Sequence, residues 1–331
     1  MSDTLGARPW ESSASDQAAF DMIDLSEAQV QARATWYYYI GGLTQQEIAD
    51  KLGITRLRVN RIVGQARTDG LIHIDIQIPL ASCVALEERL KDRYGLRDVS
   101  VVPSIDDDAM RIQTIGEAAA VMLQPKLKDG VTLGIGNGRT LGSMVRRLKP
   151  NRFANSHVIS LMGGQTFGSN TNIFEICREL ARVLGARCSY IAAPIFAPSE
   201  EGRAILMSHA GLAEVLRAAR QCDIAVVDCN TLTDQANEQR DPILADQLKS
   251  LRSAGTVGDL IGTFLDGNGG IVDHPLNARV MALGPQELKA IPVSILVAGG
   301  LDKLPIIRAA LRNAYVNGLA TDEKVAEALL A

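Results

Sequence analysis

From about residue 98 to the end of the 331-residue chain, short apolar runs alternate with stretches of helical spacing, and this alternation constrains the fold more than any other feature. The runs have the length and content of buried strands, and they occupy residues 99–102, 131–135, 158–161, 224–228 and 293–298. Strands that alternate with helices build a mostly parallel sheet with helices on both faces. The sequence therefore predicts an α/β fold, a doubly wound, mostly parallel sheet, for residues 98–331.

The segment before the sheet has a different pattern, which begins at Thr44-Gln45-Gln46-Glu47. A threonine followed three residues later by a glutamate is a capping box and starts a helix. Gly53 allows a tight turn after that helix, and Thr55 can cap a second helix over residues 56–68. The run at 71–78, in which polar and apolar residues alternate, then predicts a strand. Helix, glycine turn, helix and strand are the parts of a winged helix-turn-helix DNA-binding domain.

The second helix of this unit carries a basic face. Between residues 56 and 68, arginine and asparagine lie opposite the apolar positions, and no acidic residue occurs. Arginine can bind guanine or phosphate and asparagine can bind adenine, so this face can enter a major groove. The alternative is a solvated charged helix in an ordinary three-helix subdomain, but the cap, turn, apolar face and basic face all favour DNA binding. The residues expected to contact double-stranded operator DNA are Gln45, Thr55, Arg56, Arg58, Asn60 and Arg61.

The order of these patterns predicts the domain organisation. Residues 1–24 are rich in Ser, Asp and Ala and show no sustained period, so we expect a disordered tail. Residues 25–79 would form the DNA-binding domain, and residues 80–97 an amphipathic connecting helix. Residues 98–331 would form the α/β domain.

The charge balance restricts where nucleic acid can bind. A formal net charge of −4 excludes a protein that is basic all over, so DNA must meet a local patch. No apolar run approaches the roughly 20 residues that span a bilayer, and the N-terminal segment lacks the features of a signal peptide. The five cysteines form no CxxC pair, which is typical of reduced thiols. We therefore expect a cytoplasmic protein with no metal site, no cofactor and no membrane contact.

A glycine-rich loop at residues 134–141 ends one predicted strand and opens the next helix. Glycine lets the backbone approach a ligand, and the free N–H groups of a helix N-terminus favour an anion. The loop lacks the Gly-Lys-Ser/Thr ending of a Walker A motif and the spacing of a dinucleotide fingerprint. Its candidate ligand contacts are Gly136, Gly138, Arg139 and Thr140.

Similar loops follow two other predicted strands. Gly163-Gly164-Gln165 follows one of them, and Gly299 precedes Lys303 after another. Ligands of open parallel sheets bind beyond the carboxyl ends of the strands, so we expect these loops to converge there. Two anion-binding loops and a lysine indicate a phosphate, and Asp266 can accept hydrogen bonds from sugar hydroxyls. The alternative is that the glycines only make tight turns and that Lys303 is a surface charge.

With these motifs in this order, the chain resembles the SorC family of sugar-binding transcriptional regulators from about residue 30 to its end. The matching segments are LTQQEIADKLGITRLRVNRI, GIGNGRT, LMGGQT, GTVGDLIGTFLD, VAGGLDK and LATDEKVAEALL. No segment is decisive alone, but their order and spacing together are specific.

The resemblance implies that the α/β domain has the fold of sugar-phosphate isomerases and deaminases without their activity. It also implies a homo-oligomer, a dimer or tetramer, that binds a phosphorylated sugar or polyol. The residues that would surround the phosphate are Gly136, Gly138, Arg139, Thr140 and Lys303. Asp266 would face the hydroxyls, and Gln165 and Asn172 are further contacts.

The sequence departs from the family pattern after the central strand. Relatives often have Val-Gly-Ile-Gly there, whereas this chain has Val227-Asp228-Cys229-Asn230. This loop therefore offers polar groups to a different ligand. Thr55 also stands where the usual residue is serine, and both residues cap helices well.

Together the motifs predict a transcriptional regulator, in first place a repressor, of a carbohydrate or polyol catabolic operon controlled by a phosphorylated sugar or polyol. The alternative from another class is a sugar-phosphate isomerase-like enzyme with an appended DNA-binding segment. Such an enzyme needs an acid–base pair near the substrate carbonyl, and only Asp228 and Asp266 can be nominated for it. An unphosphorylated ligand is a third possibility. We predict no catalytic residue.

Overall fold

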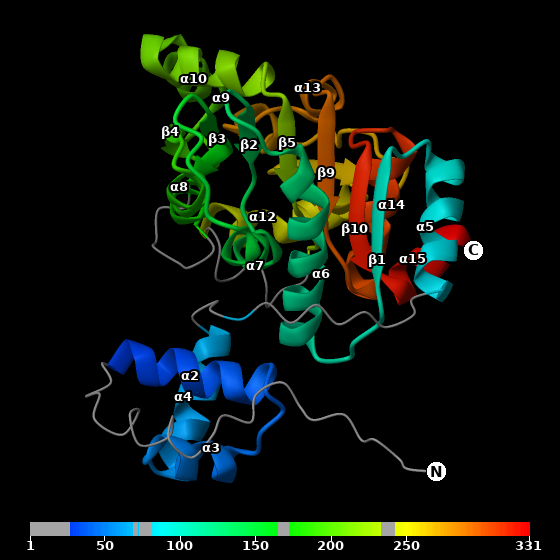
Figure 1. Cartoon of the computed structure of the whole chain (residues 1–331). Helices are drawn as coiled ribbons and strands as arrows, with labels where there is room; N and C mark the ends of the chain where they lie inside the picture. Colours follow the sequence, from blue (N-terminus) through cyan, green and yellow to red (C-terminus); the bar gives the residue numbers. More distant parts are fainter. Residues whose placement is uncertain (1–26, 69–71, 73–80, 165–171, 233–241) are drawn as a thin grey trace. The chain divides into compact units, whose positions relative to one another are not determined.

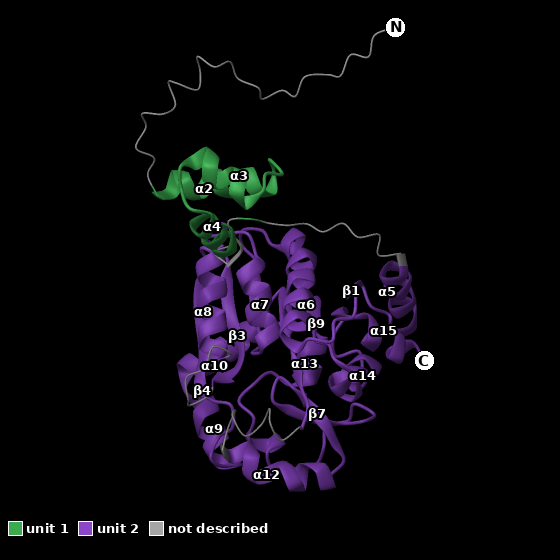
Figure 2. Cartoon of the chain, turned by 90° about the horizontal axis from the view of Figure 1, so that it is seen from below, with its two compact units in different colours: residues 1–76 green, residues 77–331 purple. Residues whose placement is uncertain are grey.

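The computed structural model describes residues 27–68, 72, 81–164, 172–232 and 242–331. The chain divides into two compact units, residues 1–76 and residues 77–331 (Figure 2). The disordered tail predicted for residues 1–24, the strand predicted at 71–78 and the side chain of Gln165 lie outside the described residues.

The smaller unit is built from three helices, α2 (Glu27–Tyr39), α3 (Gln45–Leu52) and α4 (Arg56–Thr68). Apolar residues at helical spacing face one another and form a separate core. The buried members of this core are Val30, Ala34, Ile48, Ala49, Val59, Ile62 and Val63. Helix, tight turn and helix are present as the sequence predicts.

The larger unit contains a seven-stranded sheet among its described residues, with the strand order β1-β10-β9-β5-β2-β3-β4 and every pair parallel. The strands of this sheet are β1 (Asp98–Val102), β2 (Thr132–Ile135), β3 (His157–Gly164), β4 (Arg187–Pro194), β5 (Ile224–Val227), β9 (Val293–Val297) and β10 (Gly318–Asp322). The predicted α/β class is confirmed, and each of the five predicted strands is present in this sheet.

Helices cover both faces of the sheet. The chain crosses the sheet in one direction from β2 to β3 and β4, and in the other direction from β9 to β10, so right-handed connections place their helices on opposite faces. Figure 1 shows α6 and α7 in front of the sheet. The helices of this unit are α5 (Ala81–Tyr94), α6 (Asp108–Leu123), α7 (Arg139–Arg147), α8 (Ile173–Leu184), α9 (Glu200–Ser208), α10 (Ala210–Arg220), α12 (Pro242–Ser253), α13 (Pro285–Lys289), α14 (Leu304–Arg312) and α15 (Glu323–Leu330).

Two parts of the larger unit have no counterpart in the sequence-based expectation. The first is β4, an edge strand in which only Ile191 and Ala193 are buried. The second is a small antiparallel sheet of β6 (Cys229–Asn230), β7 (Thr256–Leu260) and β8 (Thr263–Asp266). Ile261 and Gly262, with φ of 45° and 86°, form the turn between β7 and β8, as type I′ hairpin turns require.

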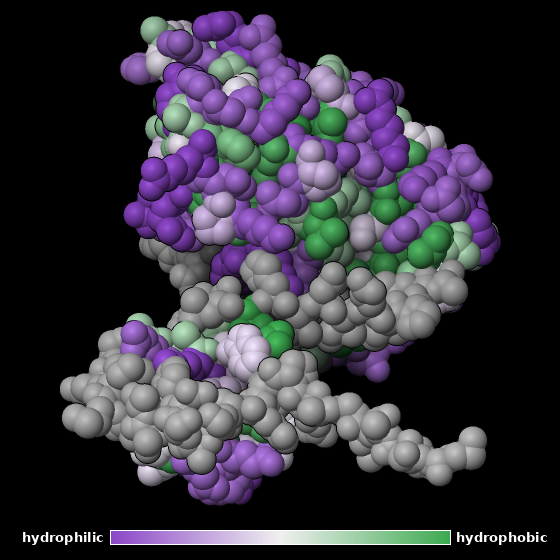
Figure 3. Space-filling view, in the orientation of Figure 1, coloured by the Kyte–Doolittle hydropathy of each residue, from purple (hydrophilic) through white to green (hydrophobic). Residues whose placement is uncertain are grey.

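Helix α5, at the position predicted for a connecting helix, packs against β1 and α15 and so belongs to the larger unit. Short 3-10 turns complete the described structure, at η1 (Gln124–Lys126), η2 (Asn277–Arg279) and η3 (Leu301–Lys303). On the face of the larger unit shown in Figure 3, hydrophilic residues predominate and apolar ones are scattered. None of the helices described is both long enough and apolar enough to cross a bilayer.

Candidate functional sites

The capping box at the start of α3 is formed in the structure. The Thr44 N–H donates to Glu47 Oε2 at 2.8 Å, and the Glu47 N–H donates to Thr44 Oγ1 at 3.3 Å. The Thr44 hydroxyl also donates to Glu47 Oε2, at 2.7 Å, and the two hydrogen bonds that Oε2 accepts from Thr44 hold the pKa of Glu47 below its ordinary value because they stabilise the carboxylate. At the other end of α3, Gly53 has a φ of 64°, a left-handed conformation that glycine adopts readily. The turn into α4 is therefore set by local sequence.

Three of the predicted DNA contacts project from the first half of α4. Arg56, Asn60 and Arg61 are exposed, and no acidic residue lies in this helix. Arg58 is different because it is half-buried and its Nη2 lies 3.0 Å from Glu27 Oε2 of α2. The exposed basic face is thus narrower than the sequence predicts.

The remaining two predicted DNA contacts position α4. Thr55 Oγ1 accepts a hydrogen bond from the Arg58 N–H at 3.2 Å, so this hydroxyl caps the helix. Gln45 Nε2 donates to Asn60 Oδ1 at 3.3 Å, which joins the beginning of α3 to α4. Sequence reasoning overlooked Leu57, whose side chain is 78% exposed beside these polar residues. Apolar side chains at such a position can contact the methyl group of thymine.

In the larger unit, the glycine-rich loop after β2 lies against the end of β5. The Gly136 N–H donates to the Val226 carbonyl at 2.9 Å. Gly138, just before α7, has a φ of 142°, and a Cβ on it would lie 2.5 Å from Asp228 Oδ2. Only glycine fits this position, since both the backbone conformation and the close approach exclude a side chain.

Lys303 and Asp228 form a partly buried ion pair beside this loop. Lys303 Nζ lies 2.7 Å from Asp228 Oδ1, and their side chains are 19% and 3% exposed. Asp228 Oδ1 also accepts the Cys229 N–H at 2.7 Å. The structure therefore brings Lys303 to the glycine-rich loop, as expected, and places a carboxylate there as well.

The first residues of α7 also lie at this edge of the sheet. Thr140 is buried, and Arg139 is 65% exposed with its Nη2 3.0 Å from Asp108 Oδ2 at the start of α6. Arg139 is thus placed to reach solvent and a ligand, but an acidic residue already accompanies it.

Close packing explains the glycines at the end of β3 and after β9. A Cβ on Gly163 would lie 2.5 Å from two carbonyl oxygens of β4, and one on Gly164 would lie 2.2 Å from the Phe174 ring. A Cβ on Gly299 would lie 2.4 Å from Asp322 Oδ2. Close packing therefore accounts for these three glycines without a ligand. Asn172 Oδ1 caps α8 by accepting the Phe174 N–H at 3.2 Å.

Asp266 does not lie with the glycine-rich loop. Its Oδ1 accepts the N–H groups of Asn268 and Gly270, at 2.8 and 2.9 Å, and so closes the turn after β8. Asn313 binds this turn at the C-terminal end of α14, whereas Lys303 precedes the first residue of that helix. The nine residues of α14 rise about 13 Å, so the turn that holds Asp266 and the residue Lys303 lie near opposite ends of this helix. The expectation assumed that β8 ends at the edge where the parallel strands end, but β8 belongs to the small antiparallel sheet.

A polar residue that sequence reasoning did not single out lies closer to the glycine-rich loop. Asp259 of β7 is buried, and its Oδ2 accepts hydrogen bonds from Asn230 Nδ2 at 3.2 Å and the Gly262 N–H at 3.0 Å. Ile261, two residues later, lies beside Gly136, with its Cγ2 3.5 Å from where a Cβ on Gly136 would stand. The sequence feature that could have identified Asp259 is its position within an otherwise apolar run, because a buried carboxylate needs a hydrogen-bonding or charged partner.

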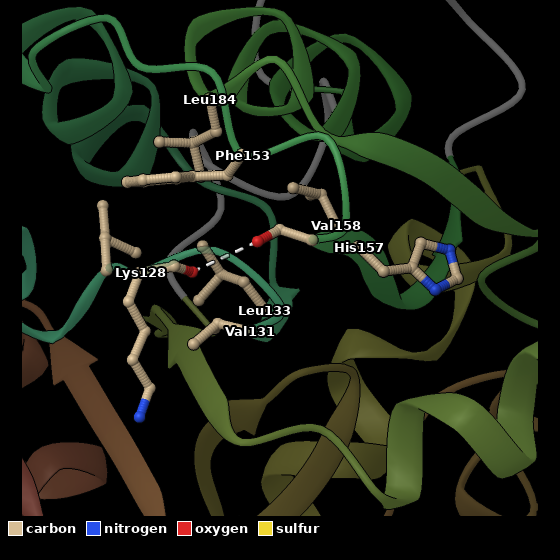
Figure 4. Close-up of a pocket in the computed structure, with 9 residues that line it drawn as sticks. Lys128, Val131, Leu133, Phe153, His157, Val158 and Leu184 are labelled. Atoms are coloured by element: carbon tan, nitrogen blue, oxygen red, sulfur yellow. Dashed lines mark hydrogen bonds between the residues drawn. The ribbon is translucent and has the colours of Figure 1, made fainter.

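A small apolar cavity lies elsewhere in the larger unit (Figure 4). It has a volume of about 10 Å³ and is lined by the starts of β2 and β3, with Phe153 and Leu184 beside them. Ser156 Oγ, at its rim, donates to the Lys128 carbonyl at 3.2 Å. This volume holds one water molecule at most, so the cavity is not a site for a sugar.

Two of the histidines are engaged in structural contacts. His157 Nε2 lies 2.8 Å from Ser189 Oγ, and His274 Nε2 lies 3.0 Å from Ser250 Oγ. Burial lowers the pKa of both imidazoles because it disfavours the charged form. Across the part of the chain that the structure describes, no cluster of His, Cys, Asp and Glu has the arrangement of a metal site.

Comparison with known proteins agrees with both units. Residues 79–331 match the family described as "Putative sugar-binding domain", and residues 35–68 match the family described as "Sigma-70, region 4". The chain is 33% identical to the transcriptional regulator LsrR of Enterobacter sp. (strain 638) over 329 residues, covering 96% of this chain and 97% of that protein.

Two further proteins are similar over most of their length. The erythritol catabolism regulatory protein EryD of Brucella abortus (strain 2308) is 29% identical over 302 residues, covering 90% of this chain and 95% of that protein. The crystal structure of the full-length sorbitol operon regulator SorC from Klebsiella pneumoniae superposes with a TM-score of 0.70 at 25% identity, covering 91% of this chain and 98% of that one. These relatives are named as regulators and not as enzymes.

Proposed function

The chain belongs to the SorC family of sugar-binding transcriptional regulators, and we propose that it represses a carbohydrate or polyol catabolic operon until a phosphorylated sugar or polyol binds. The names of two relatives support this choice, because EryD is named for erythritol catabolism and SorC for a sorbitol operon. Both compounds are polyols. We place the protein in the cytoplasm, where operator DNA is found.

The exposed polar face of α4 supports the DNA-binding part of this proposal. Arg56, Asn60 and Arg61 project from a helix whose start is set by a capped α3, Gly53 and the Thr55 cap. In helix-turn-helix proteins the first residues of the second helix contact base edges in the major groove. We assign base or phosphate contact to these three side chains, and the positioning of α4 to Gln45 and Thr55.

The edge of the sheet beside Gly138 supports the effector-binding part. The glycine-rich loop, the first turn of α7 and the Asp228–Lys303 pair meet there. Effectors of open parallel sheets bind beyond the carboxyl ends of the strands, which is where these groups lie. We therefore propose that the effector binds between them.

Effector binding at the sheet must change DNA affinity at α4, and a homo-oligomer provides the means. Paired recognition helices must match operator half-sites about one DNA turn apart, or multiples of it. An effector that alters subunit packing changes this spacing. A coupling free energy of about 1–3 kcal/mol would weaken operator binding several-fold to about a hundredfold.

Arginine substitutions test the role of α4. We expect Arg56→Ala or Arg61→Ala to weaken binding to a promoter fragment by about tenfold, since a good base contact contributes about 1–3 kcal/mol. The measurement is fluorescence anisotropy over a series of salt concentrations, and loss of a phosphate contact would reduce the salt slope by roughly 0.9.

The matched control is Arg217→Ala, which removes an exposed arginine from α10 with the same change of charge. It should leave operator affinity unchanged. All variants should keep their stabilisation by effector. Unchanged affinity in both α4 variants would remove this helix from the DNA interface.

A further inference from the structure

The carboxylate of Asp228 has one oxygen engaged and one facing the glycine-rich loop. Oδ1 binds Lys303 Nζ and the Cys229 N–H, both at 2.7 Å. Oδ2 is the oxygen that a Cβ on Gly138 would approach to 2.5 Å, and it receives no hydrogen bond from the residues that the structure describes. Oδ2 is not among the fully enclosed, unpaired side-chain atoms of the described residues, so it is open on the side of the loop and can accept a hydrogen bond from a ligand group that donates.

The ion pair also changes what Lys303 can bind. An unpaired lysine at a glycine-rich loop would attract phosphate, but here a buried carboxylate lies 2.7 Å from its Nζ. A phosphate that reached this ammonium would come close to Asp228, and two negative charges repel strongly at such distances away from water. The pair as a whole is neutral, with an ammonium on one side and a carboxylate on the other.

A hydroxyl group matches these properties, because it both donates and accepts hydrogen bonds. We propose that Asp228 and Lys303 together bind a hydroxyl-bearing carbon of the effector, and that the phosphate lies away from Lys303. Asp228 is then the residue that makes the site specific for a hydroxylated end of the ligand. This inference rests on the proposed function, since it concerns the same effector site.

The proposal replaces the sequence-based expectation that Lys303 surrounds the phosphate. That expectation considered the lysine alone, and the partner comes from the loop after β5, 75 residues earlier. Sites built to hydrogen-bond a hydroxyl discriminate strongly against ligands that lack it, because a buried polar group is left unpaired. A deoxy ligand should therefore bind much more weakly than its parent.

The test is a binding study with the full-length protein. The ligands are tetritols, pentitols and hexitols, their terminal monophosphates, and monodeoxy derivatives of whichever phosphate binds. The proteins are the wild type, Asp228→Asn, Lys303→Gln and the control Asp302→Asn, which changes an exposed acid one residue away from Lys303. Thermal shift identifies binders and titration calorimetry gives Kd.

We expect the wild type to bind the parent phosphate at least tenfold more tightly than one of its deoxy derivatives. Asp228→Asn should weaken the parent by about tenfold and bring the deoxy derivative to within about threefold of it. Lys303→Gln should also weaken the parent, but keep the wild-type preference for the phosphate over the free polyol. The control should behave as the wild type. Retained binding to a promoter fragment shows that each variant is folded.

Two results would overturn the inference while leaving the proposed function intact. One is tighter binding of the phosphate by Asp228→Asn, which would mean that the carboxylate repels a phosphate seated on Lys303. The other is a loss of about a hundredfold in phosphate preference in Lys303→Gln. If no polyol or polyol phosphate stabilises the wild type, the proposed effector class itself is refuted, and the inference with it.

Discussion

Two glycines inside helices should respond to alanine in opposite directions, because their surroundings differ. Gly116 of α6 faces α7, and a Cβ on it would lie 2.7 Å from Ser143 Cβ and 2.9 Å from both Met144 N and the Thr140 carbonyl. Carbon atoms in contact are normally about 3.5–4.0 Å apart, so α6 and α7 must separate by roughly 1 Å in Gly116→Ala. Gly64 of α4 is exposed, and no atom of the described residues lies within 4 Å of where its Cβ would stand.

The expected magnitudes follow from these distances. Overpacking of this kind costs about 1–3 kcal/mol, and the better helix propensity of alanine returns about 1 kcal/mol. Gly116→Ala should therefore lower the unfolding free energy of the larger unit by up to about 2 kcal/mol, a fall in Tm of up to about 8 °C. Gly64→Ala lacks the overpacking and should stabilise α4 by up to about 1 kcal/mol.

The effect of Gly116→Ala should extend to ligand binding. Thr140 and Ser143 lie in α7, the helix that the glycine-rich loop enters, so a displaced α7 should weaken effector binding. Differential scanning calorimetry measures the Tm, and hydrogen exchange measures the local stability of α4. A rise in the Tm of the larger unit in Gly116→Ala would show that the two helices do not approach as closely as the structure has them.

Three further changes have expected outcomes. Lys303→Met should lower the unfolding free energy of the larger unit by about 3 kcal/mol in urea unfolding, because it leaves the buried Asp228 carboxylate without its partner. Adding Asp228→Asn to this variant should restore most of the lost stability. A loss that persists in the double variant would contradict the pairing. Thr44→Ala should cost the smaller unit about 1 kcal/mol by removing the capping box, seen as faster hydrogen exchange in α3. Iodoacetamide at pH 8 should label Cys188 before Cys222, because a hydrogen bond with Cys177 lowers the pKa of Cys188 whereas burial raises the pKa of Cys222 to about 12. Mass spectrometry reports the order of labelling, and the reverse order would refute this prediction.

Local patterns in the sequence are sufficient for the helix-turn-helix and for the class of the larger fold. The capping box at Thr44 and the left-handed Gly53 depend on residues within a few positions, and apolar runs form strands wherever both faces are covered. The family is likewise recognisable from motifs that are contiguous in the chain. The residues on the outer face of α4 could be named for the same reason.

Contacts between distant segments could not be obtained in this way. Strand β4 lies at an edge of the sheet and buries only two of its side chains, and β8 pairs in an antiparallel hairpin and not in the main sheet. Because β8 belongs to the small antiparallel sheet, Asp266 lies away from the glycine-rich loop where the sequence predicts it. The chain folds Asp228 against Lys303 across 75 residues, and no period or spacing encodes that neighbourhood. Charge compensation between two buried groups depends on their distance in space, so the chemistry of this site is a property of the folded chain.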